Sequence, residues 1–359
     1  MIELDQVTKT YDGKNVVDSV TLSVGKGDLC VLIGPSGSGK STTLKMINRL
    51  IPLSSGTIRI EGQDIASVRA EELRRRIGYA IQSIGLFPHW TVEQNIAVVP
   101  RLLKWSSSQV RQRVEELLDL FHLDASEFRH KYPHQLSGGQ AQRVGVARAL
   151  AADPEVLLMD EPFGALDPIT RDSLQEEMRR VHEETGKTIV FVTHDMDEAL
   201  KLASRIAIMD EGRLVQVGTP REILNTPAND FVLNFVGQSD LGLKMLACES
   251  VETRLEPAPS ALRNDPLESI RNHFGTSDHL WLLSPEGQIE GLLTEAPTGD
   301  DDLDRSLRPL GRESHATPDM SLKEALSHMV WRKTDWLPVV DAEGRLTGEV
   351  GLNNVVERP

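Results

Sequence analysis

The sequence lacks any apolar run near the roughly 18 residues that a membrane-spanning helix requires. Met1 to Thr10 also lacks the basic start and apolar stretch of a signal peptide. Cysteine is scarce, and Cys30 and Cys248 give neither a metal-binding spacing nor a disulfide framework. These absences predict a cytoplasmic chain in a reducing compartment, which reaches a membrane only through a partner.

Basic residues are the minority charge. The chain has 39 Lys and Arg against 54 Asp and Glu, which gives a formal net charge of −15. Because nucleic-acid binding usually requires a clustered basic face, we expect no nucleic-acid partner. The length of 359 residues is sufficient for two domains.

The run GPSGSGKST, residues 34 to 42, has the spacing of a phosphate-binding loop. It follows an apolar stretch of strand length, residues 29 to 33, and precedes Leu44, Ile47 and Ile51 at helical spacing. Glycines allow successive backbone N–H groups to face a phosphate, and the helix that follows adds the positive end of its dipole. The sequence therefore predicts a strand, a loop and a helix that bind ATP.

Two side chains of the loop have expected roles. Lys40 is expected to reach the β and γ phosphates, and the Ser41 hydroxyl to hold Mg²⁺. Tyr11 is expected either to stack on adenine or to be a half-buried strand residue. The predicted ATP-binding residues are Tyr11, Gly34, Pro35, Ser36, Gly37, Ser38, Gly39, Lys40, Ser41 and Thr42.

Two further apolar runs end in polar residues. VLLMDE (156–161) and TIVFVTH (188–194) resemble strands buried on both faces, as in a parallel sheet, where ligands bind at the carboxyl ends. We expect Asp160 to share Mg²⁺ with Ser41 and Glu161 to polarise the attacking water.

Two more residues complete the predicted hydrolysis site. His194 is expected to hydrogen-bond the γ phosphate or the attacking water. The Gln82 side chain is able to touch Mg²⁺ or water, so it is included among both the catalytic and the metal-binding residues.

LSGGQ, residues 136 to 140, opens a helix after a helical stretch and offers a second phosphate-facing surface. Because the first loop already binds the phosphates of this chain, two such surfaces indicate two chains that complete each other's sites. The residues expected to contact the partner's ATP are Ser137, Gly138, Gly139 and Gln140.

The periodicity changes near residues 238–241, and the remainder contains a weak repeat. LWLLSPEGQIEG (280–291) aligns with WLPVVDAEGRLTG (336–348), each copy reading as strand, turn and strand after a helix. The predicted parts are a nucleotide domain at 1–237 with a helical insert at about 90–152, a first copy at 241–297, an acidic solvated linker at 298–304 and a second copy at 305–359.

Over residues 1 to 237 these motifs resemble the nucleotide-binding subunits of ABC transporters. GPSGSGKST resembles the Walker A loop, VLLMDE the Walker B strand and LSGGQ the signature; Gln82, His194 and Asp167 resemble the Q-loop, switch and D-loop residues. The resemblance implies an α/β P-loop NTPase core of ABC type, with an antiparallel β layer and a helical insert. It also implies a head-to-tail homodimer that encloses two ATP molecules and acts on a membrane permease.

The tail, with KMINRLIPLSSGTI (45–58) and IGLFPHWTVEQNIAVVP (84–100), resembles the quaternary-amine importers for glycine betaine, carnitine or choline, whose tail is an α+β pair of CBS modules. This implies an extracytoplasmic solute-binding protein as an indirect partner, and a position at the cytoplasmic face of the membrane. Adenylate-binding CBS modules usually carry a Ser/Thr and an Asp just after the second strand. The first copy keeps Thr294 but has Pro297, and the second has Gly351 and Asn354, which argues against simple AMP binding. A cyclic dinucleotide at the module interface and a structural dimer contact are the alternatives.

Other functions are consistent with parts of the sequence. The chain could serve an importer of another small solute, or act as a soluble ABC ATPase outside transport. The latter class would be expected to carry zinc cysteines, coiled-coil inserts or two nucleotide domains, and this sequence has none of them. A nucleotide sensor with a degenerate ATPase is a further alternative, although every catalytic position is intact.

Overall fold

The computed structural model describes residues 1–81, 85–164, 166–274, 277–298, 300–309 and 315–356. The chain divides into two compact units, Met1–Ser239 and Asp240–Pro359. Among these described residues, no helix combines the length and apolar character needed to cross a bilayer.

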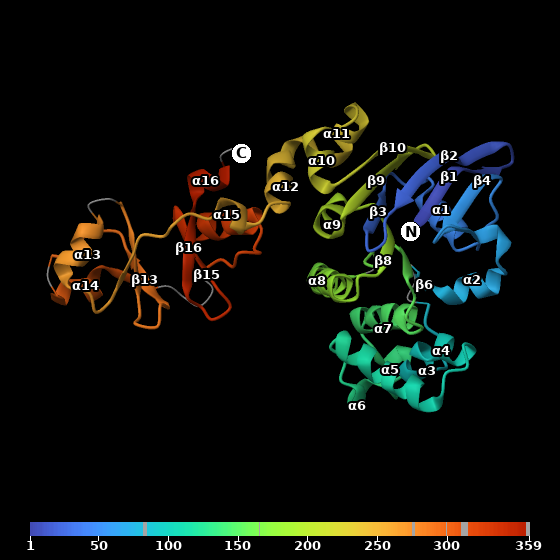
Figure 1. Cartoon of the computed structure of the whole chain (residues 1–359), viewed down its shortest axis with the longest axis horizontal. Helices are drawn as coiled ribbons and strands as arrows, with labels where there is room; N and C mark the ends of the chain where they lie inside the picture. Colours follow the sequence, from blue (N-terminus) through green and yellow to red (C-terminus); the bar gives the residue numbers. More distant parts are fainter. Residues whose placement is uncertain (82–84, 165, 275–276, 299, 310–314, 357–359) are drawn as a thin grey trace. The chain divides into compact units, whose positions relative to one another are not determined.

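The described residues of the first unit form two sheets (Figure 1). The four-stranded antiparallel sheet has the order β2 (Lys14–Val24), β1 (Ile2–Tyr11), β4 (Ser55–Ile60), β5 (Gln63–Asp64). The six-stranded sheet has the order β10 (Arg213–Gly218), β9 (Arg205–Asp210), β3 (Leu29–Ile33), β8 (Thr188–Thr193), β7 (Val156–Asp160), β6 (Ile77–Ala80). Within it β9, β3, β8, β7 and β6 pair in parallel, and β10 is antiparallel to β9.

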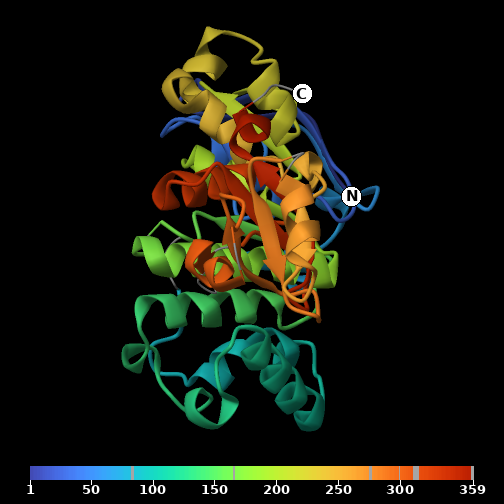
Figure 2. The same ribbon diagram turned by 90° about the vertical axis from the view of Figure 1, so that its left-hand side faces the viewer.

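The helices of the first unit fall into two groups. The helical insert is α3 (Val92–Ile96), α4 (Val98–Leu102), α5 (Ser107–Leu120), α6 (Ala125–Phe128) and α7 (Gly138–Leu150). The others are α1 (Lys40–Ile47), α2 (Ala70–Arg76), α8 (Pro168–Thr185), α9 (Met196–Leu202), α10 (Pro220–Asn225) and α11 (Asp230–Val236). Figures 1 and 2 show α3–α6 at one end of the unit, with α7 between them and the sheet.

The helical insert follows from local sequence signals. Ser106 and Gln109 form a capping box at the start of α5, which satisfies backbone N–H groups that have no partner within the helix. Val110, Val114 and Leu117 recur at helical spacing and are buried.

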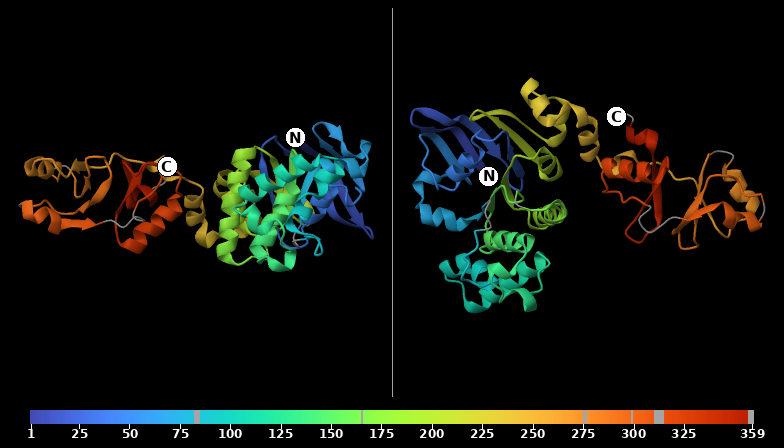
Figure 3. Two further views of the ribbon diagram at one scale, coloured as in Figure 1. Left: turned by 90° about the horizontal axis from the view of Figure 1, so that it is seen from below. Right: turned by 180° about the vertical axis from the view of Figure 1, so that it is seen from behind.

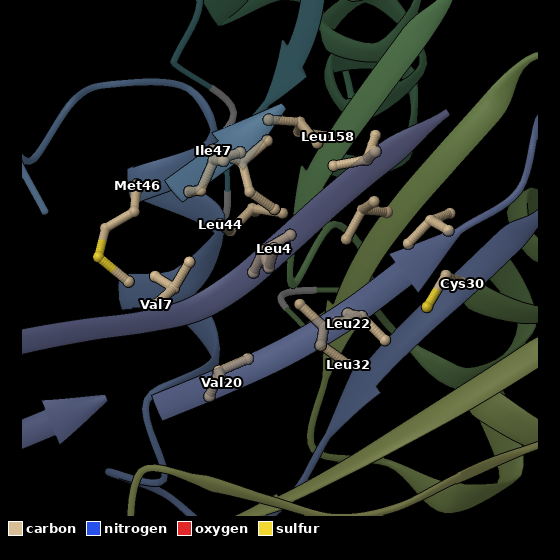
Figure 4. Packing of buried hydrophobic residues seen from close by; sticks show 14 of the residues in the cluster. Leu4, Val7, Val20, Leu22, Cys30, Leu32, Leu44, Met46, Ile47 and Leu158 are labelled. Carbon is tan, nitrogen blue, oxygen red and sulfur yellow. The ribbon is translucent and has the colours of Figure 1, made fainter. Parts of the chain in front are cut away.

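The core of the first unit lies between the antiparallel layer and the parallel sheet (Figure 4). Buried and exposed residues alternate along β1, whereas all five residues of β3 are buried. Leu4 and Leu22 from the layer join Leu32, Leu44 and Leu158 in one apolar cluster. A strand covered on both faces has no polar alternation, which explains the continuous apolar runs in the sequence.

The second unit contains the predicted repeat (Figure 3). Its strands are β11 (Ser260–Leu262), β12 (Leu280–Leu283), β13 (Ile289–Leu293) and β14 (Leu307–Pro309) in one sheet, and β15 (Trp336–Val340) and β16 (Leu346–Gly351) in another. Its helices are α12 (Leu241–Ala247), α13 (Leu267–Phe274), α14 (Asp300–Ser306), α15 (Leu322–Arg332) and α16 (Leu352–Val356).

The two copies meet through equivalent turns. Gly287 and Gly344 have φ values of 83° and 79°, in the left-handed region that favours glycine. Gln288 and Arg345, the residues that follow them, form an antiparallel bridge with each other. An approximate local two-fold axis near these turns therefore relates the two copies.

The prediction of a solvated linker at residues 298–304 is wrong for the helical part of this segment. Helix α14 starts at Asp300, and its Leu303, together with Leu307 of β14, packs against the cluster that contains Ala261 and Ile270. Burial of these leucines offsets the entropy cost of ordering an acidic run.

A buried polar cluster joins the two copies. His279 and Glu349 are each 3% exposed, and His279 Nε2 lies 2.7 Å from Glu349 Oε2. The indole N–H of Trp281 donates to the same oxygen at 2.6 Å. The His279 ring stacks on Trp336 with centroids 4.4 Å apart, and its Nδ1 lies 2.9 Å from Asp278 Oδ1.

This cluster predicts a pH dependence of stability. Burial alone lowers the pKa of His279, but the hydrogen bonds to Glu349 and Asp278 outweigh it and raise the pKa above its ordinary value. The stabilisation from His279 is therefore complete below about pH 6.5 and is lost as the pH rises through the raised pKa. We expect the thermal midpoint of the second unit, followed by tryptophan fluorescence, to fall across this range.

Glu349→Gln is the matched variant, because it keeps the side-chain shape and removes the charge that holds the proton on His279. It should flatten the pH dependence. A midpoint that rises with pH in the natural chain would contradict the prediction.

Candidate active site

Three neighbouring parallel strands end at one edge of the six-stranded sheet. Ile33 of β3 pairs with Thr193 of β8, and Asp160 of β7 pairs with Val192 of β8. The residues that follow these strand ends therefore lie at the same edge. The prediction that the phosphate loop, the acidic pair and the histidine share one edge is confirmed.

The backbone of the loop has the conformation that its glycines permit. Gly34, Gly37 and Gly39 have φ values of 154°, 82° and 98°. A Cβ on Gly34 would lie 2.0 Å from the Met209 carbonyl oxygen, and one on Gly39 would lie 2.7 Å from the Val16 carbonyl oxygen. Neighbouring backbone thus fixes two of the three glycines, whereas a Cβ on Gly37 would meet nothing within 4 Å.

Lys40 is the first residue of α1 and is only 5% exposed. Its Nζ donates to the carbonyl oxygens of Gly34 and Pro35, at 2.8 Å each. Burial lowers the pKa of Lys40 below its ordinary value, while the carboxylates of Glu161 and Asp160 oppose the shift. The ammonium group is therefore held against the backbone of the loop, where the negative charge of a bound phosphate would balance its positive charge.

Ser41 and Asp160 are in direct contact. Ser41 Oγ donates to Asp160 Oδ1 at 2.8 Å. Asp160 also acts on Tyr79 of the neighbouring strand β6: burial, together with the Asp160 carboxylate, raises the pKa of the Tyr79 hydroxyl to about 12. A hydroxyl and a carboxylate oxygen at one point are the donor set that Mg²⁺ prefers, so these two residues fit this metal.

Glu161 and His194 form the second pair, with His194 Nδ1 3.5 Å from Glu161 Oε2. Glu161 has a φ of 45°, and its backbone N–H donates to the Val192 carbonyl oxygen at 2.9 Å. The left-handed conformation is uncommon for a non-glycine residue, and the hydrogen bond to Val192 anchors it directly after β7. Most of the His194 side chain is exposed, so the pair opens to solvent.

Tyr11 is the last residue of β1 and is 44% exposed. The Nζ of buried Lys9 lies 4.7 Å from the ring centroid and donates to the Pro52 carbonyl oxygen at 2.9 Å. This ammonium group holds one face of the ring by a cation–π contact.

The segment Ser137–Gln140 opens α7. Ser137 accepts from the Gln140 backbone N–H, and Gln140 accepts from the Ser137 backbone N–H, which forms a capping box. Ser137 and Gly138 are exposed, but Gly139 is buried, and a Cβ on it would lie 2.4 Å from Thr170 Cγ2 of α8. Glycine at this position therefore allows α7 and α8 to pack closely.

Asp167 is the N-cap of α8 and accepts from the Thr170 backbone N–H at 3.1 Å. Hydrogen bonds to Thr170 hold the pKa of Asp167 below its ordinary value. Gln82, expected to contact Mg²⁺ or water, lies outside the described residues. The remaining predicted loop residues lie between β3 and the first turn of α1: Pro35, Ser36, Ser38 and Thr42.

Sequence reasoning missed a buried polar group beside this site. Glu198 accepts from Thr193 Oγ1 at 2.6 Å, and Thr193 directly precedes His194. The available signal was a glutamate four residues after the histidine, at the start of a helix. A single exposed-looking glutamate in a helical pattern gives no indication of burial.

Two family models match this chain. The ABC transporter model matches residues 17–164, and the CBS domain model matches residues 314–358. The first spans the loop, the signature segment and the acidic pair, and the second lies in the second copy of the repeat.

Curated relatives are similar over most of the chain. The choline transport ATP-binding protein OpuBA of Bacillus subtilis is 58% identical over 99% of this chain and 96% of its own length. The glycine betaine uptake system ATP-binding protein YehX of Escherichia coli is 59% identical over 70% and 81%. The osmoprotectant import ATP-binding protein OsmV of Salmonella typhimurium is 44% identical over 99% and 96%.

Among solved structures, the chain is similar to a dimeric post-hydrolysis state of the ATP-binding cassette MJ0796 bound to ADP and Pi. The two are 35% identical with a TM-score of 0.56, over 61% of this chain and 98% of that chain. A second similar structure is cbiO1 of Clostridium perfringens, from an ABC transporter complex, at 27% identity and a TM-score of 0.59, over 67% of this chain and 97% of that chain. The predicted ABC-type α/β fold with a CBS tail is confirmed.

The loop geometry predicts different costs for two glycine substitutions. Gly34→Ala introduces both strain and overlap with the Met209 carbonyl, so we expect a loss of about 3 kcal/mol or more in unfolding free energy. Gly37→Ala meets no neighbour and should cost only about 1–2 kcal/mol from its positive φ. The measurement is urea unfolding of the first unit without nucleotide, and equal losses in the two variants would refute the prediction.

Proposed function

The chain belongs to the ABC transporter family of ATP-binding proteins, and from this premise we propose that it powers a membrane importer of quaternary-amine osmolytes. The observation that carries the proposal is the joint position of Ser41–Asp160 and Glu161–His194 at the edge that holds the phosphate loop. Glycine betaine, carnitine and choline are the proposed solutes, because names of the similar proteins include each of them.

Each step of ATP hydrolysis has a candidate group in this chain. The loop N–H groups and Lys40 bind the phosphates and neutralise the charge that develops on them. Mg²⁺, when bound, shields the β and γ phosphate oxygens; Ser41 and Asp160 would hold it, and Gln82 is proposed as a further ligand.

The Glu161–His194 pair is proposed to act on the attacking water. The Glu161 carboxylate orients this water and takes up its proton, since a general base must lie within hydrogen-bond reach of the proton that it abstracts. His194, 3.5 Å from Glu161, keeps that carboxylate in place and donates toward the γ phosphate. Tyr11 is proposed to stack on adenine with the ring face opposite to Lys9.

A homodimer is proposed to complete the site. The N-terminus of α7, with exposed Ser137 and Gly138, offers backbone N–H groups and a positive helix end to a phosphate. Gly139 and Gln140 complete this segment, and Asp167 lies near it through Thr170. The dimeric state of the similar structure bound to ADP and Pi supports this arrangement.

The proposed partners follow from the importer role. The chain is proposed to bind permease subunits at the cytoplasmic face of the membrane, and to depend indirectly on an extracytoplasmic solute-binding protein. The second unit is proposed to regulate transport. A cyclic dinucleotide is the proposed ligand between its modules, because the Ser/Thr and Asp pattern of AMP-binding modules is incomplete in both copies.

Glu161→Gln should separate binding from hydrolysis. The amide keeps the size of the side chain and cannot accept a proton, so we expect kcat for ATP to fall by about 10²–10⁴ with little change in nucleotide affinity. Steady-state ATPase assays and titration with a fluorescent ATP analogue measure the two quantities. An active variant would exclude Glu161 as the base.

Uptake tests the transport role. Cells that carry the natural chain or Glu161→Gln are compared for uptake of labelled glycine betaine, carnitine and choline under osmotic stress. We expect the variant to lose uptake of at least one solute. Unchanged uptake of all three, with ATP hydrolysis retained by the purified natural complex, would exclude the quaternary-amine assignment and leave the ATPase.

A further inference from the structure

Glu198 is a buried carboxylate that the mechanism above does not use. It lies in the first turn of α9 and is only 7% exposed. Burial raises the pKa of Glu198 above its ordinary value, and the hydrogen bond from Thr193 opposes the shift. A buried carboxylate is costly unless its partners are well placed, so these partners indicate its role.

One oxygen of Glu198 fixes the end of β8. Thr193 Oγ1 donates to Glu198 Oε2 at 2.6 Å and accepts from the Asp195 backbone N–H at 3.1 Å. These two contacts hold the residues on either side of His194. The position of His194 beside Glu161 therefore depends on Glu198 through Thr193.

The other oxygen faces α8. Arg171 Nε lies 3.8 Å from Glu198 Oε1, and Arg171 Nη2 donates to the Leu166 carbonyl oxygen at 3.1 Å. The Arg171 Nε is buried and makes no hydrogen bond among the described residues. The Arg171 guanidinium thus lies between Glu198 and the backbone immediately before Asp167. A small shift would shorten the 3.8 Å between Arg171 Nε and Glu198 Oε1 to a hydrogen-bond distance.

The contacts continue toward the start of α7. Asp167 accepts from the Thr170 backbone N–H, and Thr170 packs directly on Gly139. The series runs from His194 through Thr193, Glu198, Arg171, Leu166, Asp167 and Thr170 to Gly139, and neighbours in it are joined by the chain, by a hydrogen bond, by the 3.8 Å ion pair of Glu198 with Arg171, or by packing. It joins the hydrolysis pair to the segment that is proposed to meet the partner's ATP.

We propose that Glu198 is a positioning residue for ATP hydrolysis that also couples the two ATP sites of the dimer. Through Thr193 it holds His194 beside Glu161, and through Arg171 it transmits the position of the Ser137–Gln140 segment to that pair. This inference rests on the proposed function and deepens it, because it names the residues through which occupancy of one site reaches the other.

Two substitutions separate the two roles. Glu198→Ala removes both contacts, and a misplaced catalytic group of this kind costs about 10²-fold, so we expect that loss in kcat with nearly unchanged KM for ATP. Glu198→Gln keeps an acceptor for Thr193 and loses the charge that faces Arg171. We expect it to keep most of kcat while the Hill coefficient for ATP, which the proposed coupling places above one in the natural chain, falls toward one; a coefficient of one in the natural chain would overturn the coupling.

A double-mutant cycle tests the Thr193 contact. Thr193→Val removes the hydroxyl at constant size and should lower kcat as Glu198→Ala does, and the double variant should be no worse than either. Additive losses would show that the two residues act independently, and would overturn the positioning role.

Glu93→Ala is the matched control, because Glu93 is a partly buried glutamate paired with Arg129 at 3.2 Å in the helical insert. It should lower thermal stability without lowering kcat in the purified full-length chain. A kcat that falls in Glu198→Ala only in proportion to the loss of folded protein would reduce Glu198 to a structural residue.

The failure of this inference is distinguishable from that of the proposed function. If Glu161→Gln is inactive and the Glu198 variants keep natural kcat and Hill coefficient, only the positioning proposal fails. If Glu161→Gln hydrolyses ATP normally, the proposed function fails first.

Discussion

Backbone hydrogen bonds between β3, β8 and β7 are the constraint on which the rest of the first unit depends. Their parallel register brings the ends of three strands, distant in sequence, to one edge of the sheet. A parallel sheet of this kind is covered on both faces. The apolar cluster of Figure 4 covers one of them. Side chains at the strand ends then need only short turns to meet, as Ser41 and Asp160 do.

Three buried charged side chains described above have close partners. Lys40 is surrounded by carbonyl oxygens, Glu198 by a hydroxyl and a guanidinium, and Glu349 by an imidazole and an indole. Isolated burial of any of them would cost several kcal/mol, which is about the net stability of a domain. The partners come from different elements, so each cluster also fixes how those elements pack.

The sequence was sufficient to predict the loop, the strands around it and the repeat in the tail, because each is a local pattern with a physical meaning. The glycine at position 34, which permits the positive φ, and the apolar run of β3 can both be recognised from a few neighbouring residues. The contact of Glu198 with Arg171 was not predictable, since it depends on the packing of α9 against α8. The helix α14 was missed for a related reason: its acidic residues suggested a linker, and only the tertiary environment of Leu303 favours order.

The local two-fold relation in the second unit is broken by the side chains at equivalent positions. When Gly287 is matched with Gly344, His279 corresponds to Trp336, and these two rings stack on each other. Glu349 corresponds to Leu292, so the two copies present surfaces that differ in charge at this position. Pairing two identical second halves would leave the Glu349 carboxylate without an imidazole partner. The two halves are therefore complementary and not interchangeable, because each supplies a group that the other lacks.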